Sequence, residues 1–270
     1  MKTTFKTFFA VLATTFLLAS CNDDDAAQMF NNPTGTGDLQ VKFDNAYAGN
    51  DLILGAPNTV NSQGETLKVN QIKYIVSNIV LFDENGGTFT YPKSESYFIV
   101  NEANPASTFI DLTSIPAGNY TKIKFGIGVD QAQWEAGADG QGDFLAHADA
   151  QDMMWSWSAG YKFILFEGQF TSATVSSDTA YMVHTGKTGT AYNYTEVTLD
   201  LPTKAFVRTE ITPSVHIVTD LSKIIDGTNK IALSDHNMGG MGAMIMGGEA
   251  VAQISANVPG LFTVDHVHND

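Results

Sequence analysis

The chain has 270 residues, of which 43% are hydrophobic, and 29 acidic residues against 14 basic ones give a formal net charge of -15. Nucleic-acid binding is disfavoured, because neutralising phosphates requires clustered lysine and arginine. The single cysteine, Cys21, excludes an intramolecular disulfide and a metal site built from several thiolates. The hydrophobic content suffices for one sizeable core.

The first 20 residues are typical of a bacterial secretory signal. Lys2 and Lys6 precede an apolar run over residues 8–18, and small residues follow up to Cys21. The run is too short to span a bilayer, which takes about 20 apolar residues in a helix. We therefore expect a signal peptide over residues 1–20, cleaved before Cys21.

The residues around Cys21 also indicate an anchor. Leu-Ala-Ser-Cys resembles the lipobox of bacterial lipoproteins, which implies that Cys21 is acylated and held in outer-membrane lipid; an unmodified cysteine is the alternative. Residues 21–38 are acidic and polar, with too little apolar surface to offset the entropy of ordering, so we expect a disordered tether. An acidic run after a lipidated cysteine resembles the export signal of Bacteroidota lipoproteins. It implies an outer-membrane lipoprotein, periplasmic or surface-exposed; a solubilising linker is the alternative.

Residues 39–270 are rich in strand signals and are expected to form one domain. Apolar and polar residues alternate over 39–43, residues 72–82 are β-branched and aromatic, and Asn85-Gly86-Gly87 predicts a hairpin turn. Further strands are expected at 88–91, 97–100, 108–112, 120–129, 161–170, 180–184, 195–201 and 212–218. Helices are expected after Asp130 and at 220–225 and 247–258. This frequency of short strands predicts an all-β fold, an antiparallel β-sandwich with short helical insertions.

Motifs for covalent catalysis are missing from the sequence. It contains no nucleophile elbow, no phosphate-binding loop and no dinucleotide-binding glycine pattern. A Ser-His-Asp set stays open, because such sets are recognised by geometry and not by spacing. Since nothing positive supports one, we expect that the protein is not an enzyme.

Histidine and methionine offer the clearest binding chemistry, because imidazole binds zinc, copper, iron or nickel and thioether selects Cu(I). His184 closes a predicted strand, and His266 and His268 face the same side of an extended chain. His216 lies within a strand, where a hydrogen-bonded core or surface residue is the more common reading. A solvated tail is the alternative for His266 and His268, and four methionines after His236 are either copper ligands or packing residues.

Three segments are informative together, namely residues 115–130 (IPAGNYTKIKFGIGVD), 154–168 (MWSWSAGYKFILFEG) and 183–186 (VHTG). Taken together they resemble the MbnP-like copper-binding protein family, and residues 73–79 fit the same pattern more loosely. The resemblance implies an all-β extracytoplasmic protein that binds copper through histidines beside a tryptophan. Carried over by residue, the implied metal ligands are His147 and His184, with His266 and His268 as candidates by type.

The resemblance also implies a role for one tryptophan. In some members this residue is oxidised to kynurenine by a dihaem peroxidase partner, and here it would be Trp155 or, as the alternative, Trp157; both are otherwise core aromatics. Asp149, Asp152 and Asp265 are candidates to orient the histidines. Ala148 stands where many members have proline, which bears on His147 more than on His184.

We therefore predict a lipid-anchored, extracytoplasmic copper-binding protein that captures or buffers copper, with His147 and His184 meeting beside a tryptophan. Two or three neutral imidazoles suit linear or trigonal Cu(I), so Cu(I) is favoured over Cu(II). The alternatives are a cell-surface β-sandwich adhesion or assembly module and a glycan-binding module with stacking tryptophans, both without metal. An adhesion module would expose a large aromatic patch.

Overall fold

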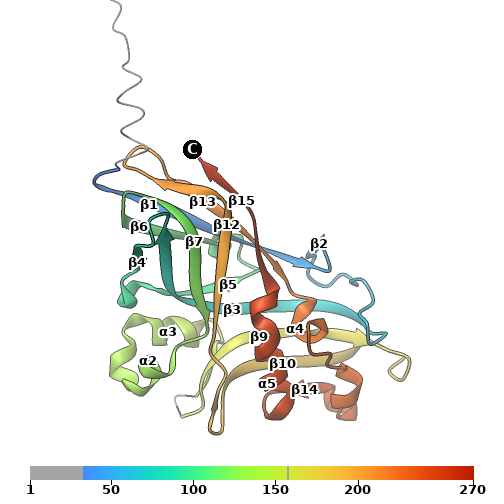
Figure 1. The fold of residues 1–270 in the computed structure, drawn as a ribbon. Helices are drawn as coiled ribbons and strands as arrows, with labels where there is room; N and C mark the ends of the chain where they lie inside the picture. The colour runs from blue at the N-terminus through green and yellow to red at the C-terminus, as the bar shows by residue number, and fades with distance from the viewer. Residues whose placement is uncertain (1–32, 157) are drawn as a thin grey trace, which may run out of the picture. The chain divides into compact units, whose positions relative to one another are not determined.

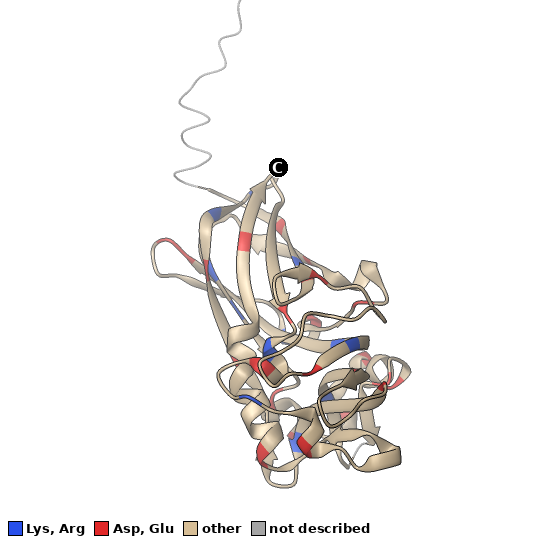
Figure 2. Cartoon of the chain, turned by 90° about the vertical axis from the view of Figure 1, so that its right-hand side faces the viewer, with Lys and Arg blue, Asp and Glu red and all other residues tan. Residues whose placement is uncertain are grey.

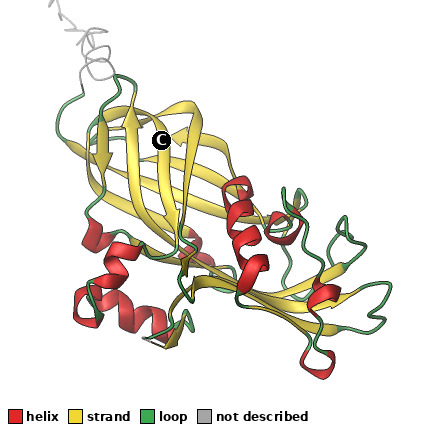
Figure 3. Cartoon of the chain, turned by 60° about the horizontal axis from the view of Figure 1, so that its bottom comes forward, coloured by secondary structure: helices red, strands yellow, loops and turns green. Residues whose placement is uncertain are grey.

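The computed structural model describes residues 33–156 and 158–270. The predictions for the signal peptide, for Cys21 and for Trp157 fall outside these residues and remain predictions. Strands dominate the described residues and short helices lie at their margins (Figure 3). The predicted all-β, sandwich-like class with helical insertions is confirmed, and antiparallel pairing predominates, with two parallel strand pairs besides.

Within the described residues, one sheet contains five strands. They are β1 (Thr36–Tyr47), β2 (Asn50–Asp51), β6 (Phe109–Pro116), β13 (Pro213–Asp220) and β15 (Phe262–Asn269). β1 is central: it pairs in parallel with β13 and antiparallel with β2 and β6, while β15 pairs antiparallel with β13. Leu39, Val41 and Phe43 are buried at alternating positions of β1, as the period of a strand requires.

The described residues form a second sheet of ten strands. They are β3 (Thr66–Asp83), β4 (Thr88–Thr90), β5 (Tyr97–Asn101), β7 (Gly118–Ile127), β8 (Met154–Ser156), β9 (Gly160–Thr171), β10 (Thr179–Thr188), β11 (Ala191–Tyr192), β12 (Thr195–Val207) and β14 (Ala243–Ile245). The first half of β3 pairs with β9 and the second half with β7. The register shifts between Ser77 and Val80, where Asn78 has φ 51°, a conformation that asparagine tolerates. Because of this irregularity, the single long strand β3 pairs with both β9 and β7.

The main core fills the space between the two sheets. Phe43 and Phe262 of the first sheet meet Phe125 of the second edge-on, with ring centroids 5.5 Å apart for Phe43–Phe125 and 5.3 Å for Phe125–Phe262. Such pairs contribute about 0.5–1.5 kcal/mol each beyond the burial of their area. A smaller cluster, which includes Phe163 and Leu165 of β9, covers a different part of the second sheet.

Short helices and 3-10 turns connect the strands. The α-helices are α2 (Gln131–Glu135), α3 (Asp143–Ala150), α4 (Lys223–Asp226) and α5 (Gly248–Asn257), and α2 and α3 lie together beside the sheets (Figure 1). The 3-10 turns are η1 (Lys93–Glu95), η2 (Pro105–Thr108), η3 (Ala138–Gln141), η4 (Leu233–His236), η5 (Gly239–Met241) and η6 (Val258–Leu261). Asp130 begins α2 by accepting a hydrogen bond from the backbone N–H of Gln133, an N-cap that its sequence position favours.

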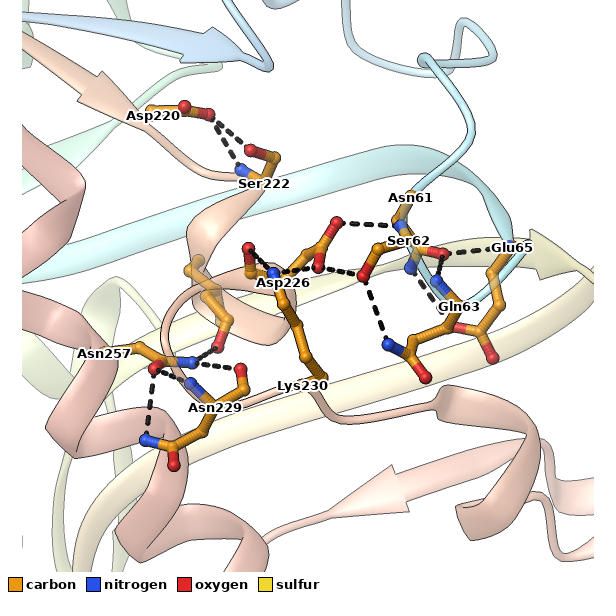
Figure 4. A network of polar contacts seen from close by, with 11 residues as sticks. Asn61, Ser62, Gln63, Glu65, Asp220, Ser222, Asp226, Asn229, Lys230 and Asn257 are labelled. Atoms are coloured by element: carbon orange, nitrogen blue, oxygen red, sulfur yellow. Dashed lines mark hydrogen bonds and ion pairs between the residues drawn. The ribbon is translucent and has the colours of Figure 1, made fainter.

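A polar network joins residues 61–65 to the end of α4 (Figure 4) and to the segment that leads into β14. Glu65 is fully buried, and its carboxylate accepts hydrogen bonds from the backbone N–H groups of Leu233 and Ser234 at 3.1 and 2.8 Å. Asp226 at the end of α4 accepts another from the backbone of Ser62 at 2.8 Å. Because an unpaired buried carboxylate is very costly, these bonds fix the path of residues 233–234.

Residues Thr34–Asp270 form one compact unit. In the view of Figure 2, Lys and Arg are dispersed among Asp and Glu along the chain. A dispersed arrangement does not favour binding to a phosphate backbone. Within the described residues, no helix is long and apolar enough to cross a membrane.

Candidate metal centres

His184 lies on β10 in a buried position with a carboxylate beside it. It pairs with Leu165 of β9 and is 4% exposed. Its Nε2 lies 2.7 Å from Oε1 of Glu167, two residues further along β9, and its Nδ1 is buried without a hydrogen-bond partner among the described residues. In the neutral ring, a proton on Nε2 that is donated to this carboxylate leaves the lone pair on Nδ1. That is the arrangement in which a neutral imidazole binds a metal.

Trp155 lies next to this ring. The centroids of the Trp155 and His184 rings are 6.2 Å apart. The indole also packs on Gly186, where an added Cβ would stand 2.8 Å from Cζ3 of Trp155 and 2.5 Å from the carbonyl oxygen of Tyr161. Glycine at position 186 is therefore what allows β8 and β10 to approach so closely.

Methionine side chains gather on the same face of the sheet. Val183 and Ile245 are paired and buried in the main core, so their neighbours in β10 and β14 face the opposite way. Those neighbours include the directly paired Met182 and Met244. Met246 follows β14 and lines a groove of about 550 Å³ with Trp155. We call Met182, Met244 and Met246 the methionine face.

His147 occupies a different kind of position. It is exposed on α3, and its ring lies 6.3 Å from that of Phe144. The structure records no hydrogen bond or ring contact between His147 and His184, although both are described. Asp149 is exposed on the same helix, and Asp152 forms an ion pair with Lys162 at 2.8 Å. The assignments of His147 and Asp149 stay predictions.

The other two predicted ligands, His266 and His268, lie next to His216, which the sequence analysis interpreted as an ordinary strand residue. His266 and His268 of β15 and His216 of β13 each offer a ring nitrogen, and these nitrogens lie within 4.8 Å of one another. We call these three residues the histidine cluster. Burial lowers the pKa of His216, as do the neighbouring His266 and Lys42. Of the three predicted orienting carboxylates, Asp265 contacts a histidine, since its Oδ2 lies 2.6 Å from Nδ1 of His266.

Sequence reasoning missed Glu167 and His216. Glu167 lies in residues 154–168, one of the segments that resemble the family, but its contact with His184 depends on the register of β9 against β10. His216 stood in a predicted strand, with no sign that another strand would bring two more imidazoles to it.

An all-β sandwich with a buried histidine beside an indole, and with methionines on the same sheet face, is a candidate metal-binding protein. The family profile of MbnP matches residues 36–245, more than half of the sequence, and the chain belongs to the MbnP family. Membership confirms the predicted resemblance and supports a copper-related function in general terms. The match includes His184, Trp155 and Glu167 and ends before β15.

Among solved structures, MbnP from Methylosinus trichosporium is similar to this chain. The two share 16% identity, with a TM-score of 0.48 over 80% of this chain and 82% of the other. The search of curated proteins found no match.

Proposed function

We propose that this protein is a non-enzymatic, extracytoplasmic copper-binding protein that captures or buffers Cu(I) at the His184 region. The observation that carries the proposal is the buried, unpartnered Nδ1 of His184, whose tautomer is set by Glu167. An unsatisfied buried nitrogen costs about 1–3 kcal/mol, which a metal bound there would offset. Family membership supports copper as the metal.

The surroundings of His184 favour the reduced ion. Thioethers are soft donors that select Cu(I), and the methionine face supplies them from β10 and from the segment at β14. Trp155 is half-buried beside the ring and would shield a bound ion from water. A square-planar Cu(II) site would need more nitrogen or oxygen ligands than this face offers in the described residues.

The remaining parts of the proposal rest on the sequence. Acylated Cys21 would anchor the chain in outer-membrane lipid, on the periplasmic side or the cell surface. Oxidation of Trp155 to kynurenine by a dihaem peroxidase partner is implied by the family resemblance alone. An intact-mass spectrum of the native protein, with mapping of the peptide that contains Trp155, tests both modifications.

The exposed side chains give little support to the two alternatives that bind no metal. Among the described residues, the exposed large hydrophobic side chains include a single aromatic, Phe109. The large aromatic patch expected of an adhesion module is not found among those residues. Trp134 packs beside Tyr192 with centroids 6.4 Å apart, so it is not a free platform for a sugar ring.

Anaerobic titration of Cu(I) against a chromogenic competitor tests the proposal. We expect His184→Ala to weaken binding by about 100-fold or more, because loss of a ligand should cost at least as much as loss of a partner that orients one, which costs about 10- to 100-fold. His147→Ala tests the second ligand that the family implies. The matched control is His236→Ala, which removes an imidazole from η4. Unchanged Cu(I) affinity in both His184→Ala and His147→Ala would refute the proposal.

A further inference from the structure

The histidine cluster lies on the outer face of the five-stranded sheet. In β13, Val215 and Ile217 point into the core, so His216 between them points outward. His216 pairs directly with His266 of β15, and Ser214 pairs with His268. Residues opposite each other in an antiparallel pair have Cβ atoms about 4.5–5.5 Å apart, and diagonal neighbours are still within reach of large side chains.

A β-bulge is what turns both β15 histidines outward. Val264 and Val267 both pack against the core although they are three residues apart, which strict alternation does not allow. The register shifts between His216 and Ile217, which pair with His266 and Val264, so Asp265 is the extra residue. After this bulge, His266 and His268 fall on the outer face.

The ring geometry fits a shared ion. His216 stacks on His266 with centroids 4.2 Å apart, and the His268 ring stands edge-on to both, at 5.2 Å from His216 and 4.6 Å from His266. The Nε2 atoms of His266 and His268 are 3.0 Å apart. Two nitrogens bound to one tetrahedral Zn²⁺ at about 2.0–2.1 Å lie roughly 3.3 Å from each other. Small ring rotations therefore suffice to converge the three donors.

The charges around the cluster also suit a cation. Asp265 accepts a hydrogen bond from Nδ1 of His266, which leaves Nε2 of that ring with a lone pair directed at His268. On the neighbouring strand β1, Lys42 pairs with His216, and Asp44 lies two residues further along. The negative charge of Asp44 acts on His216 and favours a cation there. Lys42 opposes a cation, but its Nζ is drawn toward the ring of Phe109, 5.8 Å from the centroid.

We propose that the histidine cluster is a second metal site, for a divalent cation of the Zn²⁺ or Cu²⁺ type, separate from the His184 region. Three imidazoles and a solvent-accessible face give three protein ligands with a position left for water, the pattern of an open site. Imidazoles without thioether suit borderline divalent ions. β15 belongs to the five-stranded sheet and β10 to the ten-stranded one, and the C-terminal end of β15 lies at the opposite end of Figure 1 from β10.

The test is isothermal titration of the full chain with Zn²⁺ after removal of metals, with the absorption of bound Co²⁺ as a second readout of tetrahedral geometry. We expect one Zn²⁺ per chain at this site and its loss in the triple variant His216→Gln, His266→Gln, His268→Gln. His236→Gln is the matched control, and His184→Ala should leave Zn²⁺ binding unchanged. Circular dichroism of the triple variant establishes that the fold persists.

Two results would overturn the inference. One is a folded triple variant that binds Zn²⁺ and Co²⁺ as the unaltered chain does, which would leave the cluster as hydrogen-bonded rings only. The other is loss of Zn²⁺ binding in a His184→Ala variant that circular dichroism shows to be folded, which would show that the two regions are not separate. A chain that binds Zn²⁺ at the cluster but no Cu(I) would uphold this inference and refute the proposed function.

Discussion

The His184 region and the histidine cluster place the same side chain in opposite surroundings. His184 is buried, contacts a carboxylate from the neighbouring strand and an indole, and shares its sheet face with Met182 and Met244. His268 is exposed on an outer sheet face, where imidazoles are the donors and water has access. Histidine alone therefore does not define the metal, because the softness of the other ligands and the burial of the site favour either Cu(I) or a divalent ion.

The two regions also differ in how they relate to the family. His184, Trp155 and Glu167 lie within the segment that matches MbnP, whereas the cluster takes two of its three rings from β15, beyond that segment. Substitutions at one site should therefore leave metal binding at the other site unchanged. The predictions below test that independence and the contrast in burial.

The largest expected effect is on stability. Metal-free His184→Ala should lose about 2 kcal/mol of unfolding free energy, because the emptied buried site and the lost partner of Glu167 together outweigh the relief of the unpartnered Nδ1. His268→Ala removes an exposed ring and should change stability by less than about 0.5 kcal/mol. Urea denaturation in the presence of a chelator measures both. Equal losses in the two variants would contradict the contrast in burial.

The second prediction concerns the carboxylate that sets the tautomer of His184. Glu167→Gln should weaken Cu(I) binding by about 10- to 100-fold, the range typical of partners that orient a metal-bound histidine. The amide can donate to Nε2 and so favours the tautomer with the proton on Nδ1, where the metal should bind. Competitive Cu(I) titration measures the change, and Zn²⁺ binding serves as the internal control. Undiminished Cu(I) affinity would mean that Glu167 does not act through His184.

Much of the fold was readable from local pattern, because alternation and turn residues are local signals. Residues 39–43 and 72–82 lie within β1 and β3, and the helix expected after Asp130 begins at Gln131. β14 was missed because methionine and glycine around it give no strand period. Its parallel pairing with β10 joins segments far apart in the sequence, as do the hydrogen bonds of the buried Glu65 to the backbone of residues 233–234.

The candidate sites were less predictable, because each depends on strand register. The Trp155 ring lies 6.2 Å from that of His184, and its role beside a bound metal, which the family resemblance implies, stays a prediction. His266 and His268 were identified as a pair, but their partner His216 follows only once β13 and β15 are aligned. A one-residue bulge at Asp265 determines which face of the sheet both rings are on. The sequence of residues 262–269 contains no signal that predicts this bulge.

The third prediction tests how the layer of α2 and α3 responds to acid. Partial burial acts to raise the pKa of Asp130, but hydrogen bonds from Asn78, Lys93 and Tyr97 outweigh it and lower the pKa from 3.8 to about 2. A depressed folded-state pKa stabilises the protein fully above about pH 4, and that stability is lost as the pH falls toward 2.

Asp130→Asn should therefore cost on the order of 1 kcal/mol at neutral pH, after allowance for solvent screening, and should flatten the acid dependence. Urea denaturation from pH 7 to pH 2 measures this. The control is Asp200→Asn, which breaks an exposed ion pair with Lys122 and should change stability little. Identical acid profiles for Asp130→Asn and the unaltered chain would contradict the prediction.

The smallest expected effect is on the exposed counterpart of Glu167. Asp265 contacts Nδ1 of His266 as Glu167 contacts Nε2 of His184, but the Asp265 side chain is 62% exposed against 28% for Glu167. Solvent and salt screen an exposed charge, so Asp265→Asn should weaken Zn²⁺ binding by only about threefold. The loss should shrink further at high ionic strength, which isothermal titration at low and high salt measures. Asp265→Asn could instead weaken Zn²⁺ binding as much as Glu167→Gln weakens Cu(I) binding. That result would mean that both carboxylates act by orienting the histidine ring, an effect that does not depend on burial, and that the electrostatic environment matters less at both sites.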